Sequence, residues 1–177
     1  MLEAADLQVQ IAAAEADLRR DWVEFNAATL NAICRDIRAA VRAVDSGIAL
    51  GLMTVGSSLS TYAGSDLRAQ TAALGATRGR PGHGFYWDDA PRGIFDKTMD
   101  VGRQCRDYAP AVVDVQYELD NYPNIALEKA DRTVLNEVWL ALMMGCNGAA
   151  FHMLKRAVGS MEDFEPLMAA NLIWFDN

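Results

Sequence analysis

The sequence predicts an α/β protein, specifically a partial (β/α)8 TIM barrel of about four βα units preceded by a helical segment over residues 1–46. Strand-like apolar runs alternate with helical patterns of about 8 to 20 residues, which is typical of parallel βαβ units. One strand also alternates apolar and polar residues. That pattern suits the lining of a barrel better than an open sheet covered by helices on both faces. We expect residues 1–177 to form a single domain.

The first 45 residues are expected to be helical throughout. Apolar residues recur from Trp22 to Val44 with the 3.6-residue period of a packed helix. Asp21 is a suitable N-cap and Gly47 a suitable helix terminator. The sequence therefore predicts two helices, one over about residues 2–19 and a second that begins after Asp21.

Two strands are predicted in the middle of the chain. The continuous apolar run over residues 48–55 is typical of a strand buried on both faces. A polar loop over residues 56–65 and a short helix over 67–74 are expected to follow. The Gly/Pro-rich segment 79–84 then leads into the second predicted strand, Phe85–Trp87.

The second half of the chain continues the alternation. Pro91 favours a helix start, and the spacing predicts a helix over residues 91–108. A third strand is expected over 112–120 and a helix over 128–144. A short fourth strand over 149–154 and a helical tail over 160–175 complete the predicted order.

The third strand indicates where a site would lie. Its apolar face is formed by Val113, Val115, Tyr117 and Leu119, and its polar face by Asp114, Gln116, Glu118 and Asp120. Active sites of barrels lie at the carboxyl ends of the strands. Glu118 and Asp120 lie at that end, as do Asp88 and Asp89 on the preceding strand and His152 on the next. Asp89 also fits a plain capping role for the following helix.

Three passages resemble a known family. Residues 117–123, Tyr-Glu-Leu-Asp-Asn-Tyr-Pro, resemble the nucleophile strand of clan A retaining glycoside hydrolases, nearest to the family 42 β-galactosidase-like group. Residues 135–142 and 145–151 are similar to the helix seven and strand eight passage of that group. The resemblance makes residues 82–89 strand six and 48–55 strand five, so the chain would hold strands 5 to 8.

The resemblance covers roughly residues 20–155 and implies that Glu118 is the nucleophile. Retaining hydrolysis also needs a second carboxylate as acid/base. In the family that glutamate follows strand four, but no Asn-Glu pair at a strand end occurs upstream of Ile48, and Asn136-Glu137 falls within a predicted helix. We therefore expect a fragment, or a chain completed by a complementing half-barrel, that is inactive or nearly so alone.

The same resemblance implies that the carbohydrate substrate binds to residues around Glu118. Carboxylate and amide oxygens accept hydrogen bonds from sugar hydroxyls, and aromatic rings pack on sugar faces, although a strand aromatic is more often a core residue. The residues expected to bind substrate are Asp88, Asp120, Asn121, Tyr86, Trp87 and His152.

Composition excludes several other partners. The net charge of -8 disfavours nucleic acid, and no apolar run is long enough to cross a membrane. Cys34, Cys105 and Cys146 are far apart in sequence and only two histidines could join them, so we expect structural thiols, no bound metal and no cofactor. The first residues lack a secretory signal, which predicts a cytoplasmic protein if the chain is complete.

Two other function classes stay open. Residues 2–45 could form a helical hairpin for homo-oligomerisation, making the chain a non-catalytic carbohydrate-binding or oligomerising scaffold domain. Alternatively, the acids at the strand ends could bind a divalent metal in a metal-dependent barrel enzyme.

Overall fold

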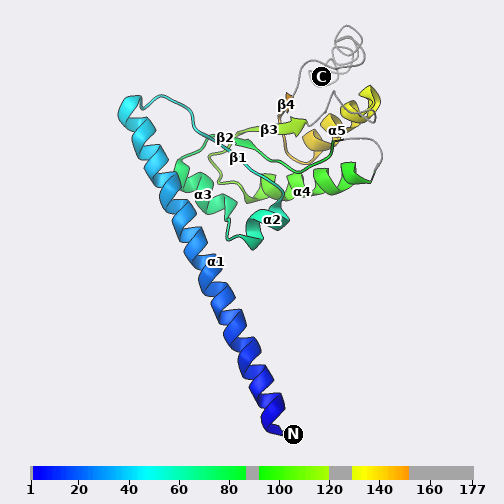
Figure 1. Cartoon of the computed structure of the whole chain (residues 1–177). Coiled ribbons are helices and arrows are strands. Elements are labelled where there is room, and N and C mark those ends of the chain that lie inside the picture. Colours follow the sequence, from blue (N-terminus) through cyan, green and yellow to red (C-terminus); the bar gives the residue numbers. More distant parts are fainter. Residues whose placement is uncertain (1, 87–91, 120–128, 152–177) are drawn as a thin grey trace.

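The computed structural model describes residues 2–86, 92–119 and 129–151 (Figure 1). These residues form a mixed α/β structure. Its elements are, in chain order, α1 (Leu2–Val44), β1 (Gly51–Met53), α2 (Ser57–Tyr62), α3 (Leu67–Leu74), β2 (Arg78–Arg80), α4 (Gly93–Asp107), β3 (Asp114–Leu119), α5 (Asp131–Met143) and β4 (Gly148–Phe151). The helix predicted over residues 160–175 lies outside the described residues.

Helix α1 is a single helix, so the prediction of two helices is wrong. It contains neither glycine nor proline, and nothing in its sequence therefore interrupts the hydrogen-bond ladder. Asp21 lies within the helix instead of capping it. One turn earlier, Asp17 pairs with Arg20 at 2.9 Å across the predicted boundary.

The prediction of the second strand at Phe85–Trp87 is wrong for its described residues: Phe85 and Tyr86 belong to no strand, Trp87 lies outside the described residues, and Arg78–Arg80 form β2. The turn after α3 is short: Gly75 closes the helix in the left-handed region with φ of 65°. The chain then pairs at once with the strand before α3, as Thr77 N–H donates to Leu50 O at 3.0 Å. Phe85 is buried, but as a loop residue, so its hydrophobicity reflects burial without strand pairing.

Several other predicted elements are present with shifted ends. Helix α3 occupies residues 67–74 as predicted, and the Asp66 side chain caps it by accepting from Ala69 N at 2.9 Å. The segment predicted as a polar loop, residues 56–65, contains the short helix α2. The helices α4 and α5 and the strands β1, β3 and β4 are each shorter than their predicted ranges or displaced by a few residues.

The four strands form one parallel sheet in the order β1-β2-β3-β4. The predicted alternation holds along β3, where every second residue from Val115 to Leu119 is buried and those between are half-buried. The buried face packs against α3, α4 and α5, and Figure 1 shows α3 and α4 on one side of the sheet. The core comprises Leu67, Val101, Tyr108, Val115, Tyr117, Leu119, Val134, Val138, Ala141 and Cys146.

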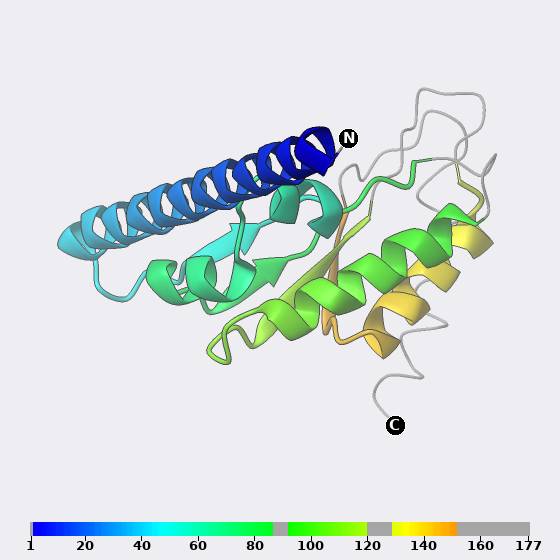
Figure 2. The ribbon, with the colours of Figure 1, turned by 90° about the horizontal axis from the view of Figure 1, so that it is seen from below.

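Neighbouring helices contact one another beside this apolar face. Helix α3 contacts both α1 and α4, and α4 contacts both α5 and the short helix α2. Figure 2 shows α4 and α5 side by side. The opposite face of the sheet carries the polar side chains of β2 and β3, and this face holds Glu118.

Candidate functional site

Glu118 lies near the carboxyl end of β3 and pairs with an arginine from the neighbouring strand. Its Oε1 is 2.7 Å from Nη2 of Arg80, the last residue of β2. Only 16% of the Glu118 side chain and 30% of the Arg80 side chain are exposed, so water screens the pair less than it would at an open surface. A second pair, Arg78 with Asp114 at 3.0 Å, lies nearer the amino ends of the same strands.

The backbone beside the Glu118 carboxylate is constrained by Gly82. A Cβ at residue 82 would lie 2.6 Å from Glu118 Oε2 and 2.2 Å from the carbonyl oxygen of Thr54. Both distances are shorter than real contacts of a methyl group. The loop after β2 therefore approaches the carboxylate and β1 more closely than any residue larger than glycine permits.

Behind β3, a fully buried ionic cluster holds Glu118 from its backbone side. Nζ of Lys97, on α4, donates to the carbonyl oxygen of Glu118 at 2.6 Å and lies 3.3 Å from Oε1 of Glu137, on α5. Lys129 Nζ lies 2.5 Å from Glu137 Oε2, and Tyr117 OH donates to Glu137 Oε1 at 2.6 Å. The cluster ties α4, α5 and β3 together directly beneath the site.

Sequence reasoning missed this cluster, although a signal for it is present. Glu137 shares a helical face with Val134, Val138 and Ala141, and Lys97 lies three residues after Ile94. A charged residue on the buried face of a helix requires a buried partner. The expectation that Asn136-Glu137 lies within a helix is confirmed, and the Glu137 side chain faces the core.

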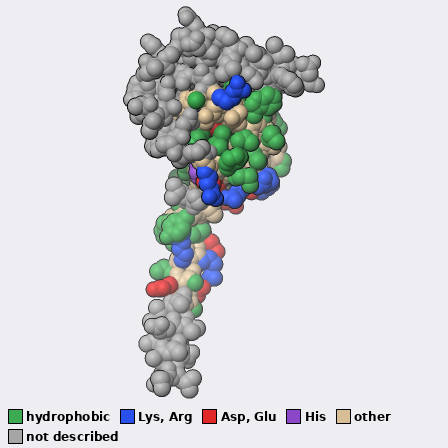
Figure 3. All heavy atoms as spheres, turned by 90° about the vertical axis from the view of Figure 1, so that its right-hand side faces the viewer, with side chains coloured by type: hydrophobic (Ala, Val, Ile, Leu, Met, Phe, Trp, Pro, Cys, Tyr) green, Lys and Arg blue, Asp and Glu red, His purple; other side chains and the backbone are tan. Residues whose placement is uncertain are grey.

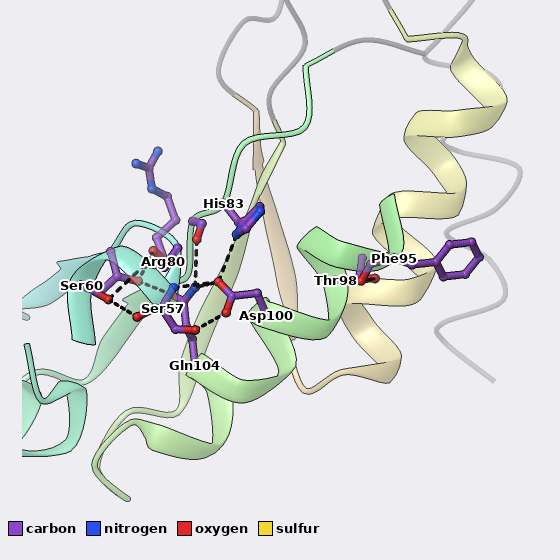
Figure 4. A network of polar contacts seen from close by, with 11 residues as sticks. Ser57, Ser60, Arg80, His83, Phe95, Thr98, Asp100 and Gln104 are labelled. Carbon is purple, nitrogen blue, oxygen red and sulfur yellow. Dashed lines mark hydrogen bonds and ion pairs between the residues drawn. The ribbon is translucent and has the colours of Figure 1, made fainter. Parts of the chain in front are cut away.

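A second polar network gathers on Asp100 of α4 (Figure 4). Its carboxylate accepts from Ser57 N at 2.8 Å and from Gln104 Nε2 at 3.0 Å, and it also bonds the Ser57 hydroxyl and His83 Nδ1, the latter at 3.2 Å. Gln104 Nε2 donates further to Gly82 O at 2.9 Å. The network therefore fixes the loops that follow β1 and β2 against α4.

The surroundings of the Asp100 carboxyl group favour its ionised form. Burial by itself would raise the pKa of this carboxyl, but hydrogen bonds from Ser57, Gln104 and His83 outweigh burial and lower the pKa below its ordinary 3.8. Each donor stabilises the charged form. Asp100 is therefore a negatively charged anchor for Ser57 and His83 at neutral pH.

Ser57, His83 and Asp100 do not form a nucleophilic triad. In a triad the histidine bonds the serine hydroxyl on one side and the carboxylate on the other. Here the Ser57 hydroxyl and His83 Nδ1 both bond the Asp100 carboxylate, so the carboxylate lies between them. This arrangement positions loops and gives Ser57 no base from His83.

The predicted substrate-binding residues are only partly placed. Tyr86 is half-buried in the loop after β2, and its ring lies against Gly84. The others, Trp87, Asp88, Asp120, Asn121 and His152, lie outside the described residues, as does Asp89. Of the predicted site, the structure thus places Glu118 and Tyr86 and adds Arg80 as a direct partner of Glu118.

Two of the three cysteines lie close together although they are 41 residues apart in the sequence. Sγ of Cys105, on α4, lies 3.8 Å from Sγ of Cys146, which precedes β4. All three cysteines are free thiols. The hydrogen bond from Cys146 lowers the pKa of Cys105, and the same contact together with burial raises that of Cys146.

Two other features, a metal-binding cluster and a membrane-spanning helix, are not found in the described part of the chain. Within residues 2–86, 92–119 and 129–151, no three His, Cys, Asp or Glu side chains are grouped to hold a metal ion. None of the helices in these ranges combines the length and hydrophobicity needed to span a membrane. A shallow hollow of about 400 Å³ lies on α1, lined by Glu15, Leu18, Arg19 and Trp22, away from Glu118.

Comparison with protein-family models, with curated proteins and with solved structures finds no match to this chain.

Proposed function

We propose that this chain is half of a (β/α)8 barrel from a retaining glycoside hydrolase of the β-galactosidase-like kind, with Glu118 as the nucleophile. The observation that carries the proposal is the Glu118–Arg80 pair at the carboxyl end of a parallel sheet. Barrel enzymes place their catalytic groups at this end of the strands.

The order of the strands supports a barrel. A doubly wound sheet reverses its strand order at a switch point and carries helices on both faces. Here the order runs β1-β2-β3-β4 without reversal, and α3, α4 and α5 all pack on one face. The opposite face carries Arg78, Arg80 and Glu118, as expected if it faces the enclosed centre of a barrel.

The surroundings of Glu118 suit a nucleophile. A glycosidase nucleophile must be ionised when it attacks the anomeric carbon, and the adjacent Arg80 guanidinium stabilises the anion. The Lys97 hydrogen bond to the Glu118 carbonyl and the buried cluster behind it hold the backbone in place. A rigid carboxylate lowers the entropic part of the barrier to attack.

The chemistry needs a second group that this chain is not proposed to supply. A Glu118 oxygen forms a bond to the anomeric carbon while the bond from that carbon to the leaving oxygen breaks. The leaving oxygen needs a proton unless it departs as a stable anion. In the proposed enzyme a complementing half-barrel provides that acid, so ordinary glycosides should turn over slowly or not at all on the chain alone.

Ligand-observed NMR with methyl β-galactoside and methyl β-glucoside tests the proposal against a scaffold function. We expect binding of at least one sugar by the wild type and by Glu118→Gln, because the amide keeps the shape and hydrogen-bonding capacity of the carboxylate. Arg80→Ala should weaken binding, since Glu118 loses its partner. Absence of sugar binding in every form would favour a scaffold and contradict the proposal.

A further inference from the structure

The carboxyl end of α4 and the turn after α5 bring two thiols into contact. Sγ of Cys105 lies 3.8 Å from Sγ of Cys146. In a disulfide the two sulfurs are about 2.05 Å apart, so they have to approach by only about 2 Å. Rotation of the side chains about their Cα–Cβ bonds moves the sulfurs by a distance of this order. The pair is therefore close enough to be joined in the folded protein.

Two glycines allow this close approach. Gly102 lies one turn before Cys105 on the same face of α4, and a Cβ there would be 3.1 Å from Met144 Sδ. Gly145 has a φ of 113°, a conformation that favours glycine, and a Cβ there would lie 3.4 Å from Cys105 Cβ. Figure 2 shows α4 beside the connection from α5 to β4. The turn that carries Cys146 thus rests directly against the face of α4 that carries Cys105.

The backbone holds Cys146 at this position. Its N–H donates to Ala141 O at 3.1 Å, and the N–H of the next residue, Asn147, donates to Val115 O at 2.9 Å. Cys105 lies in the last turn of α4. Both thiols are therefore attached to hydrogen-bonded backbone, and their contact is a feature of the fold.

The two thiols differ in exposure and in acidity. Cys105 is half-buried and precedes the exposed Arg106, whereas Cys146 is only 5% exposed. The hydrogen bond from Cys146 and the nearby Arg106 charge lower the pKa of Cys105, while the same hydrogen bond and burial raise the pKa of Cys146. The thiolate is the reactive form of cysteine. Cys105 is thus the thiol that reacts first with a reagent from solvent, and Cys146 is placed to react with the product.

We propose that Cys105 and Cys146 form a redox-active pair that reduces a hydroperoxide and is converted to a disulfide. The Cys105 thiolate attacks an oxygen of the hydroperoxide, so that a sulfur–oxygen bond forms while the oxygen–oxygen bond breaks. The alkoxide or hydroxide that leaves takes up the proton that the Cys105 thiol had released, and Cys105 becomes a sulfenic acid. The Cys146 sulfur then attacks the Cys105 sulfur, and hydroxide departs as water with the Cys146 proton. Two thiols thereby lose two electrons and two protons.

The change is reversible and has a structural consequence. A dithiol restores both thiols by exchange through a mixed disulfide and is itself oxidised. While it persists, the disulfide fastens the end of α4 to the start of β4 and closes a loop that contains β3 and α5. A cross-link of this kind restricts the unfolded chain and so favours the folded state. The inference is independent of any role for Glu118.

Cys34 provides an internal reference for the reactivity of the pair. It lies on α1, the long helix that extends from the body of the protein (Figure 3), and is buried against Leu74 and Ala76. Burial raises the pKa of its thiol. We therefore expect hydrogen peroxide to oxidise Cys105 faster than Cys34 by about tenfold or more.

Peptide mapping of the full chain after peroxide treatment tests for the disulfide. We expect two thiols to be lost, a Cys105–Cys146 link to be found within one chain, and dithiothreitol to restore both thiols. Cys34 should remain free. Oxidation of Cys34 as fast as that of Cys105, or a pair that stays reduced when Cys34 is oxidised, would overturn the proposal.

Cys146→Ser separates the two steps. A serine hydroxyl can donate a hydrogen bond to the Cys105 thiolate, but it cannot form a disulfide. The sulfenic acid on Cys105 should therefore accumulate in this variant and be captured by dimedone, whereas wild type should give little adduct and Cys105→Ala none at that peptide. Equal capture in wild type and Cys146→Ser, or no capture in Cys146→Ser, would contradict the proposed sequence of steps.

Thermal unfolding tests whether the disulfide fastens the fold. Peroxide-treated wild type should unfold about 5 °C or more above the reduced protein. Cys105→Ala, treated in the same way, corrects for oxidation of exposed side chains such as Met143, which is 77% exposed. A midpoint that does not rise relative to this control would contradict the proposed cross-link.

Discussion

Oε1 of Glu118 on β3 lies 2.7 Å from Nη2 of Arg80 on β2, and the pair joins the carboxyl ends of two neighbouring parallel strands. The pair lies on the polar face of the sheet, and the buried Lys97–Glu137–Lys129 cluster lies behind Glu118. Glu118 is thus held at two points. The Arg80 guanidinium pairs with its carboxylate, and Lys97 donates a hydrogen bond to its backbone carbonyl oxygen.

Neutralising Glu137 is expected to destabilise the protein strongly. Glu137→Gln leaves Lys97 and Lys129 without the carboxylate that both contact in a fully buried setting. Removing one partner of a buried ionic group costs about 3–5 kcal/mol. Urea unfolding measures this loss, with Glu24→Gln on the exposed surface of α1 as the control, expected within about 0.5 kcal/mol of wild type. A loss below about 1 kcal/mol for Glu137→Gln would show that the cluster contributes little.

Asp100 is expected to stabilise the protein in a pH-dependent manner. Because the pKa of Asp100 is below its unfolded value of 3.8, its contribution is present above pH 3.8 and is lost as the pH falls through the folded pKa. The difference in unfolding free energy between wild type and Asp100→Asn should therefore be larger at pH 7 than at pH 3. Asp107→Asn, at an exposed site on the same helix, should show no such change. A difference independent of pH would contradict the hydrogen-bond assignment.

Substitution of Gly82 by alanine is expected to disturb the site, because the added methyl group would clash with the backbone at Thr54 and with the Glu118 carboxylate. The clash with Thr54 O at 2.2 Å is with backbone and cannot be relieved by a rotamer change, so Gly82→Ala should cost about 1–3 kcal/mol and displace the Glu118 carboxylate. Gly47→Ala, where the nearest atom is a side-chain oxygen at 3.2 Å, is the control. Equal stability of the two variants by thermal unfolding would show that the loop tolerates a side chain.

The thiol of Cys105 is expected to react faster than an ordinary cysteine of equal exposure. Its lowered pKa depends first on the hydrogen bond from Cys146, so Cys146→Ala should shift the pH profile of Cys105 alkylation to higher pH. Mass spectrometry after timed iodoacetamide treatment gives the profile for that residue alone. Cys34→Ala, remote from the pair, should leave it unchanged; an identical profile in Cys146→Ala would contradict the pairing.

The sequence predicted local patterns better than it predicted long-range contacts. Alternation along β3 follows from its residue types and is confirmed, and Asp66 and Gly75 bound α3 as their chemistry favours. The position of β2 could not be predicted from the sequence. Arg78–Arg80 include no hydrophobic residue, and they form a strand only because they pair with β1. The break predicted at Asp21 failed because its capping ability is overridden by an uninterrupted helix.

The contact between Glu118 and Arg80 could not be predicted from the sequence for a similar reason. Arg80 is 38 residues upstream and reaches Glu118 only because β2 and β3 are neighbours in register. Cys105 and Cys146 meet because α4 and the segment before β4 lie together beside the sheet. Contacts of this kind depend on strand order, which composition and periodicity do not determine.

Trapping with 2,4-dinitrophenyl 2-deoxy-2-fluoro-β-galactoside tests the central claim most directly. Dinitrophenolate leaves without a proton, so the missing acid is not needed, and the fluorine slows hydrolysis of the ester that forms at the nucleophile. We predict that peptide mass spectrometry finds one fluorohexosyl group on Glu118, and none on Glu118→Gln. Absence of labelling, or labelling of another residue that persists in Glu118→Gln, would contradict the assignment of Glu118 as a glycosidase nucleophile.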